Sequence, residues 1–173
     1  MNASPTSPPM PEAWLRGPLP GIDAFLMPAA HAFVHAREDL PRAVTGLDTE
    51  RLWRRPGGAA SVGFHLLHIA GSTDRLLTYA RGEALSDAQR LALAAEREPP
   101  ADGDADGLLQ AAFRALDAAV DQLRRTPRES LLEERRVGRA GTPSTVLGLV
   151  FHAAEHAARH AGQALATARA VRG

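Results

Sequence analysis

The sequence predicts an all-α protein, an up-and-down four-helix bundle with one short accessory helix. Apolar residues recur at helical spacing over four segments of about 19 to 29 residues each. Runs of β-branched residues are almost absent, which argues against a sheet. A chain of 173 residues is long enough for one domain with a hydrophobic core and short for two. Four long helices in one domain favour a bundle, with an irregular all-α fold as the alternative.

The first two helices are expected at residues 22–46 and 61–81. In the first, apolar side chains recur every three or four positions, and Pro28 marks either an early kink or a later start. A break rich in proline and glycine follows this helix. Ser61 then suits the N-cap of the second helix, and Gly82 marks its end because glycine readily adopts a left-handed conformation.

Two further helices and a loop complete the expected bundle. The accessory helix covers residues 86–97 and is ended by the proline pair that begins at Pro99. The third long helix covers 107–125 and carries one continuous apolar face. Residues 126–142 contain a proline and two glycines and are expected to form a crossover loop. Pro143 suits the first residue of the last helix, since the N–H that proline lacks is unpaired at that position anyway.

The N-terminal segment differs in composition from the rest of the chain. Six prolines fall between Pro5 and Pro20, so residues 1–20 are expected to be an arm, disordered or lying on a partner subunit. The domain then covers 21–173. The arm has neither the basic start nor the apolar run of a signal peptide, and no later segment approaches the ~20 apolar residues of a membrane span. We expect a soluble, cytoplasmic protein.

Charge and cysteine content exclude several classes of function. Twenty basic side chains balance twenty acidic ones, so no net field would draw the protein to nucleic acid or to a membrane. The chain contains no cysteine, which excludes a disulfide framework, a thiol nucleophile of its own and thiolate metal ligands. A small-molecule substrate is the partner that these observations leave.

Histidines are spaced as metal ligands near the C-terminus. His152, His156 and His160 follow one another at steps of four in the last expected helix. Residues four apart on a helix have Cβ atoms roughly 5–6 Å apart, so two imidazoles can bind one ion. On a helical projection His156 and His160 lie at the edge of the apolar stripe, where bundles build metal sites. His152 lies further round and is the weakest candidate.

Other histidine pairs leave alternatives open. His65 and His68 lie in the second helix, which is apolar on most sides, so either could face the core. A core histidine that is hydrogen-bonded to a carbonyl is the commoner arrangement. His31 and His35 in the first helix could enter the same cavity, although such pairs are more often half-exposed. Arg75 could recognise an anionic substrate, but a salt bridge between helices is the commoner role.

Two motifs resemble those of a known family. The first runs from Trp53 through Arg-Arg-Pro-Gly-Gly-Ala-Ala-Ser-Val-Gly-Phe-His-Leu-Leu to His68 and Ile69. The second is His156-x-x-x-His160-x-Gly-Gln. Together they resemble the DinB-like superfamily of metal-binding four-helix bundles, over about residues 20 to 170. The resemblance implies that His68, His156 and His160 form a metal triad.

The resemblance also implies a chemistry. Three neutral imidazoles leave a coordination position open, as in catalytic sites, and suit zinc or nickel. Related proteins include transferases that use low-molecular-weight thiols such as mycothiol or bacillithiol, so the implied function is a thiol-dependent transferase in which the ion lowers the pKa of the thiol. The alternatives are a metal-dependent hydrolase and a non-catalytic metal- or small-ligand-binding module. The candidates for orienting the ligands are Glu155, Tyr79 and backbone carbonyls, and no strong general base is evident. The family resemblance also implies a homodimer.

Overall fold

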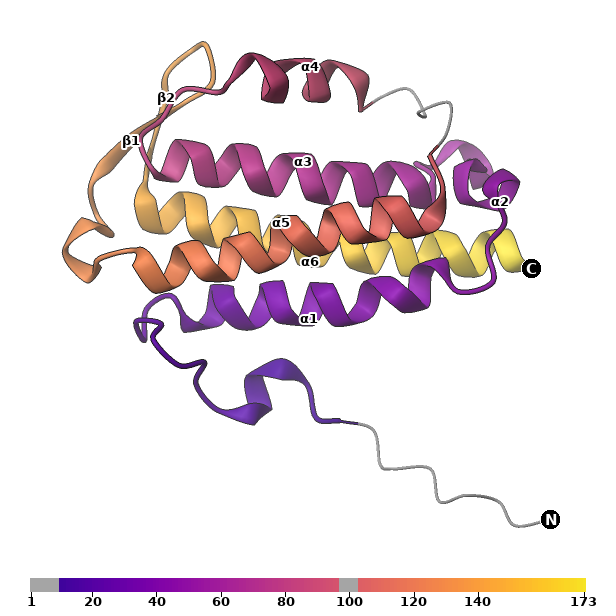
Figure 1. Ribbon diagram of the computed structural model, residues 1–173, viewed down its shortest axis with the longest axis horizontal. Helices are drawn as coiled ribbons and strands as arrows, with labels where there is room; N and C mark the ends of the chain where they lie inside the picture. Colours follow the sequence, from indigo (N-terminus) through magenta and orange to yellow (C-terminus); the bar gives the residue numbers. More distant parts are fainter. Residues whose placement is uncertain (1–9, 97–102) are drawn as a thin grey trace.

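The chain folds into a bundle of four long helices with one further helix lying along its side (Figure 1). The computed structural model describes residues 10–96 and 103–173. The long helices are α1 (Met27–Val44), α3 (Val62–Ala80), α5 (Ala105–Arg125) and α6 (Val146–Arg172). The short ones are α2 (Thr49–Trp53) and α4 (Asp87–Ala95). The predicted all-α fold class is therefore confirmed.

The arrangement of the long helices places α3 beside α6. Each of α3 and α1 packs against both α5 and α6. The helices α3 and α5 run in one direction, and α1 and α6 run in the other, because α4 carries the chain back along the bundle between α3 and α5 (Figure 1). No helix in the described part of the chain combines the length and the apolar character needed to cross a membrane.

Capping residues explain where the helices begin. Ser61 accepts a hydrogen bond from the backbone N–H of Phe64 at 3.1 Å, so α3 begins where the sequence predicts. The helix α1 begins at Met27, later than the predicted residue 22, with Pro28 in its first turn, where a missing N–H costs nothing. Asp104 caps α5, which starts two residues before the predicted position 107.

The segment predicted as a loop contains a β-hairpin. Strand β1 (Glu134–Val137) pairs antiparallel with β2 (Thr142–Thr145). The prediction that Pro143 opens the last helix is wrong. Pro143 lies in β2 opposite Arg136, and in a two-stranded hairpin a proline is tolerated because both strands are edges. The helix α6 begins at Val146 instead, because the Thr145 hydroxyl accepts from the Gly148 N–H at 3.0 Å.

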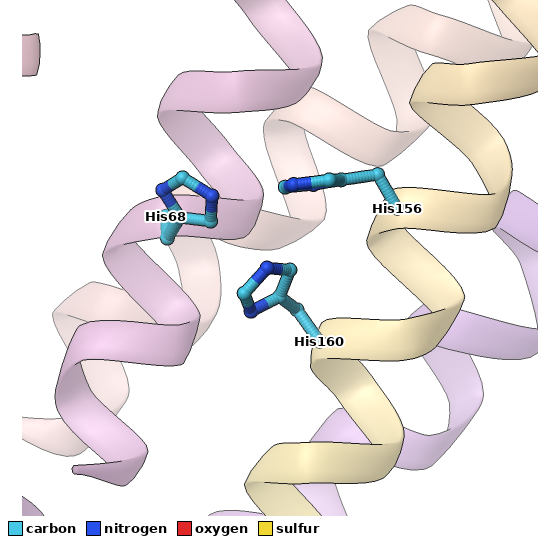
Figure 2. Close-up of side chains that lie close together, drawn as sticks. All are labelled: His68, His156 and His160. Atoms are coloured by element: carbon cyan, nitrogen blue, oxygen red, sulfur yellow. The ribbon is translucent and has the colours of Figure 1, made fainter. Parts of the chain in front are cut away.

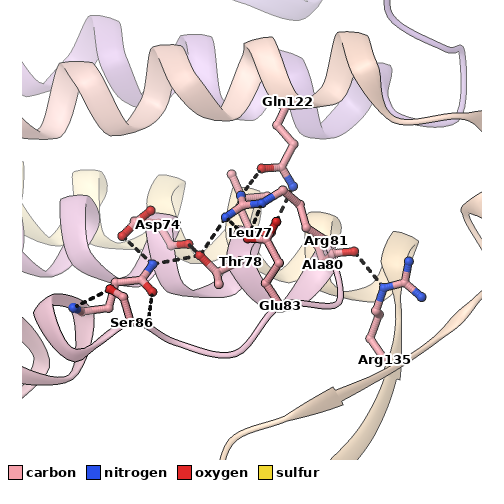
Figure 3. A network of polar contacts seen from close by, with 10 residues as sticks. Asp74, Leu77, Thr78, Ala80, Arg81, Glu83, Ser86, Gln122 and Arg135 are labelled. Atoms are coloured by element: carbon pink, nitrogen blue, oxygen red, sulfur yellow. Dashed lines mark hydrogen bonds and ion pairs between the residues drawn. The ribbon is translucent and has the colours of Figure 1, made fainter.

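Polar anchors attach α4 and the hairpin to the end of α3 (Figure 3). The Gln89 amide of α4 donates to Asp74 Oδ2 at 2.7 Å and to Thr78 Oγ1 at 2.8 Å. On the hairpin, Arg135 Nε donates to the carbonyl oxygen of Ala80 at 2.9 Å. No side chain within α4 itself is buried, so hydrogen bonds and not apolar packing hold this helix in place.

The N-terminal segment contacts the bundle where it is described. A short 3₁₀ turn at Ala13–Arg16 lies against α1, and Ala13 is buried. Arg16 donates to both carboxylate oxygens of Glu38 at 2.6 and 2.7 Å. The turn at Ala13–Arg16 therefore lies on α1 of the same chain. The proline pair at Pro99, predicted to end the accessory helix, lies outside the described residues, as does Arg97 at the predicted end of that helix.

The indole of Trp53 packs directly on the backbone of α3 at Gly63. A Cβ at position 63 would lie 2.6 Å from the ring, so only glycine fits without displacing it. Gly162 of α6 has no atom within 4 Å of the corresponding position. The two glycines have the same helical conformation and opposite surroundings.

This difference predicts opposite effects of alanine. Gly63→Ala should lower the free energy of unfolding by about 1–3 kcal/mol, because the indole must move. Gly162→Ala should raise it by roughly 0.5–1 kcal/mol, because alanine has the higher helix propensity and meets no neighbour. Urea unfolding followed by circular dichroism measures both. An unchanged free energy of unfolding in Gly63→Ala would contradict the packing of Trp53 on this position.

Candidate metal centre

Three imidazoles from α3 and α6 meet in the space between the two helices. His68 comes from α3, and His156 and His160 lie one turn apart on α6. Their candidate ligand atoms all lie within 4.8 Å of one another. The ring centroid of His160 is 4.5 Å from those of His68 and His156, which are 5.0 Å from each other. A nitrogen of each ring points into the shared space (Figure 2).

The ring of His68 is oriented by a buried carboxylate. Glu96, at the C-cap of α4, places Oε2 2.8 Å from His68 Nδ1. Its other oxygen accepts from Arg75 Nη1 at 2.5 Å, and Glu96 is only 8% exposed. Burial raises the pKa of Glu96, but the hydrogen bonds from His68 and Arg75 outweigh this effect and hold the pKa below its usual range. The carboxylate thus accepts from Nδ1–H, which leaves Nε2 of His68 for an ion.

Gly71 makes room for this carboxylate on the surface of α3. A Cβ at this position would collide with Glu96 Oε1 and would lie 2.6 Å from Arg75 Nη1. A glycine inside a helix costs stability, so its presence here has a packing reason. It lets Glu96 and Arg75 meet over the helix backbone.

The other two rings also have partners at Nδ1. His160 Nδ1 lies 3.0 Å from Nδ1 of His65, which is buried. Burial, followed by the nearby His68, lowers the pKa of His65 to about 4, so this imidazole is neutral at pH 7 and its Nδ1 can accept. His156 Nδ1 lies 3.4 Å from the Ser72 hydroxyl, which itself donates to the carbonyl oxygen of His68 at 2.5 Å.

These contacts define one consistent protonation pattern. All three contacts are satisfied when Nδ1–H of each ring donates outward, to a carboxylate, a hydroxyl or an imidazole, and this tautomer leaves Nε2 as the candidate ligand atom. Burial, and then the charges of neighbouring histidines, lower the pKa of His156 to about 4 and that of His160 to about 3. Neutral imidazole is the form that binds metal, so His156 and His160 are in the ligand form at neutral pH.

The other four histidines lie outside the three-histidine cluster. His65 lies behind His160 as its hydrogen-bond partner. His152 is half-exposed and contacts Glu155 at 2.9 Å, although its ring lies next to that of His156. His31 and His35 are on α1, where they contact a backbone carbonyl at 3.0 Å and an aspartate at 3.4 Å. Neither enters the cluster.

Sequence reasoning missed the residues that orient the ligands. The expected candidates were Glu155 and Tyr79, but Glu155 contacts His152 and Tyr79 packs against the hydrophobic core. The partners found are Glu96, Ser72 and His65. The only sequence signal for Glu96 was an unexplained glycine inside a helix at position 71, and that signal does not name its partner.

A cavity of about 690 Å³ adjoins His68 on the side of Glu96. The helix α3 contributes Phe64 and His68, and α4 contributes Arg90, Leu93 and Glu96. Arg139, in the turn of the hairpin, also lines the cavity. The volume of the cavity lies within the roughly 300–1,000 Å³ usual for small-molecule sites.

The fold and the site together define a four-helix bundle with a three-histidine centre that fits a divalent ion. Three neutral nitrogen donors, each fixed by an outer hydrogen bond, form the ligand set that zinc and related ions prefer. The profile of the DinB superfamily matches residues 32–164, and the chain belongs to this superfamily. No curated protein matches the sequence.

Removing the carboxylate should weaken metal binding. Glu96→Ala is expected to lower zinc affinity by about 10–100-fold, because His68 loses the acceptor that fixes its tautomer. Glu96→Gln keeps an acceptor and should lose less. Competition with a chromophoric chelator measures both, and Glu155→Ala is the matched control with unchanged affinity. Equal affinity of Glu96→Ala and wild type would exclude this orienting role.

The metal-free protein should lose stability as the pH falls below about 6.5. In the unfolded chain histidine takes up a proton near its ordinary pKa, whereas folded His156 and His160 do so only near pH 4 and 3. Acid therefore favours the unfolded state across this window, and the stabilisation is fully present above it. Urea unfolding between pH 7.5 and 4.5 should show a flatter pH dependence in a His156→Gln, His160→Gln double variant than in a His31→Gln, His35→Gln control. Identical slopes would contradict the burial argument.

Proposed function

We propose that this protein is a metal-dependent transferase that uses a low-molecular-weight thiol. His68, His156 and His160 would hold a zinc or nickel ion through Nε2 and leave a coordination position open, and the cavity lies beside one of them, His68. The observation that carries the proposal is this combination of a three-nitrogen donor set with a cavity large enough for a small molecule.

The bound ion would supply positive charge that lowers the pKa of the thiol. The residues of the chain do the rest. The histidines are kept in one tautomer by Glu96, Ser72 and His65. The thiol proton is lost to solvent, and the sulfur attacks the electrophile, forming an S–C bond while the bond to the leaving group breaks. The cavity beside His68 would hold the thiol cosubstrate.

A hydrolase is supported less well by the site. Hydrolysis would require a base within reach of a bound water. Glu96 is the nearest candidate, but both of its oxygens are engaged, by His68 Nδ1 and by Arg75, on the outer side of the ligand ring. Its lowered pKa also makes it a weak base. A thiol needs no such base, because ionisation near a metal ion suffices.

Cobalt substitution tests the proposal. A thiol that ligates cobalt adds an intense charge-transfer band in the near ultraviolet, and we expect this band on titration with at least one small thiol, mycothiol and bacillithiol included. His160→Ala should lose both the bound cobalt and the charge-transfer band, whereas His152→Ala should keep both. If no thiol gives the band or any turnover with electrophiles, the transferase is excluded, and ester or amide cleavage would then indicate the hydrolase.

A further inference from the structure

The cavity beside His68 has an apolar wall. The Phe64 ring stacks on the imidazole of His68, with centroids 5.3 Å apart and planes within 10° of parallel. Leu93, across from α3 on α4, also lines the cavity and is 46% exposed. An exposed leucine beside a stacked phenylalanine gives the methylene groups of a ligand a surface to cover.

The same cavity carries two guanidinium groups from separate elements. Arg90 comes from α4, and Arg139 comes from the hairpin turn. Arg90 donates through Nη1 to the carbonyl oxygen of Leu85 and through Nη2 to Asp87. Asp87 is 91% exposed, so this ion pair is hydrated and weak. Arg139 forms no ion pair with any residue that the structure describes. Arg139 is therefore free to bind an anion, and Arg90 can exchange its hydrated contact with Asp87 for one.

No exposed negative charge in the described lining offsets these arginines. Among those lining residues only Glu96 is acidic, and both of its oxygens are occupied by His68 and Arg75. The chain as a whole has equal numbers of acidic and basic side chains, so composition does not explain the excess. The cavity is a local positive site in a neutral protein.

We propose that this cavity recognises a carboxylate-bearing small molecule, and that the thiol cosubstrate is therefore an acidic one. Arg90 and Arg139 would pair with its carboxylate groups, since the planar guanidinium matches that geometry. Phe64 and Leu93 would cover its carbon chain. The thiol part of this inference rests on the proposed function, whereas carboxylate recognition rests on the cavity alone.

The test compares three probes by calorimetry on the zinc-loaded protein. Mercaptosuccinate has a thiol and two carboxylates, 2-mercaptoethanol has a thiol only, and succinate has carboxylates only. Mercaptosuccinate should bind about tenfold more tightly than 2-mercaptoethanol, and added salt should reduce the difference. Arg139→Gln and Arg90→Gln should each weaken mercaptosuccinate by about threefold to fivefold and leave 2-mercaptoethanol unchanged.

Matched variants separate recognition from folding. Arg139→Lys keeps the charge and should retain most of the affinity, and Arg114→Gln changes an exposed arginine of α5 that does not line the cavity. Arg139 is exposed in a turn, so its loss should leave the fold and the zinc content unchanged.

The outcomes distinguish this inference from the proposed function. If all thiols bind alike and the arginine variants have no effect, carboxylate recognition is excluded and the transferase stands. If succinate binds as tightly as mercaptosuccinate, depends on Arg139, and no thiol gives the cobalt band, the cavity recognises acids but the thiol function is excluded.

Discussion

The close approach of α6 to its neighbours is the constraint on which the rest of the structure depends. Between Ala153 and Ala168 every buried position of α6 except Thr167 is an alanine. Such small side chains let the helix axes come close, and they lose no rotamer entropy on burial. The imidazoles at the edge of this face can therefore span the remaining gap to α3. A face of leucines would hold the two helices further apart.

The candidate centre also depends on the helix that is least well packed. The carboxylate that orients His68 comes from the end of α4, which buries none of its own side chains against the bundle. Two polar attachments hold this helix, Gln89 to the end of α3 and Glu96 to His68 and Arg75. Ligand orientation and the position of the cavity wall are thus fixed by the same contacts. Loss of either attachment would therefore shift α4 and disturb the contacts of the other.

Periodicity and capping signals predicted the bundle well. Ser61 and Gly82 located α3 because a hydroxyl acceptor and a left-handed glycine act through local geometry, which a sequence displays directly. The hairpin was missed because its strands are short and exposed, and Pro143 satisfied the rule for a helix start as well as that for an edge strand.

The site was predictable only in part. Helical spacing placed His156 and His160 together, because residues four apart must be neighbours. Spacing left open whether His65 or His68 faced them, since the first turns of α3 are buried on most sides. Both rings in fact lie against His160, one at its Nδ1 and the other across the shared space. The position of Glu96 beside His68 depends on the path of the chain between α3 and α5, and no local sequence pattern predicts that path.

Position 71 shows how stability and chemistry compete for one residue. The notch that Gly71 leaves in α3 is filled by the Glu96 carboxylate and the Arg75 guanidinium. Alanine at position 71 would gain about 1 kcal/mol of intrinsic helix propensity. Its Cβ would displace the Glu96–Arg75 ion pair from the surface of α3, because it would overlap atoms of both side chains. Redesign for thermal stability, guided by helix propensity alone, would select this substitution early. It would produce a bundle with the same histidines and without the buried acid that orients one of them.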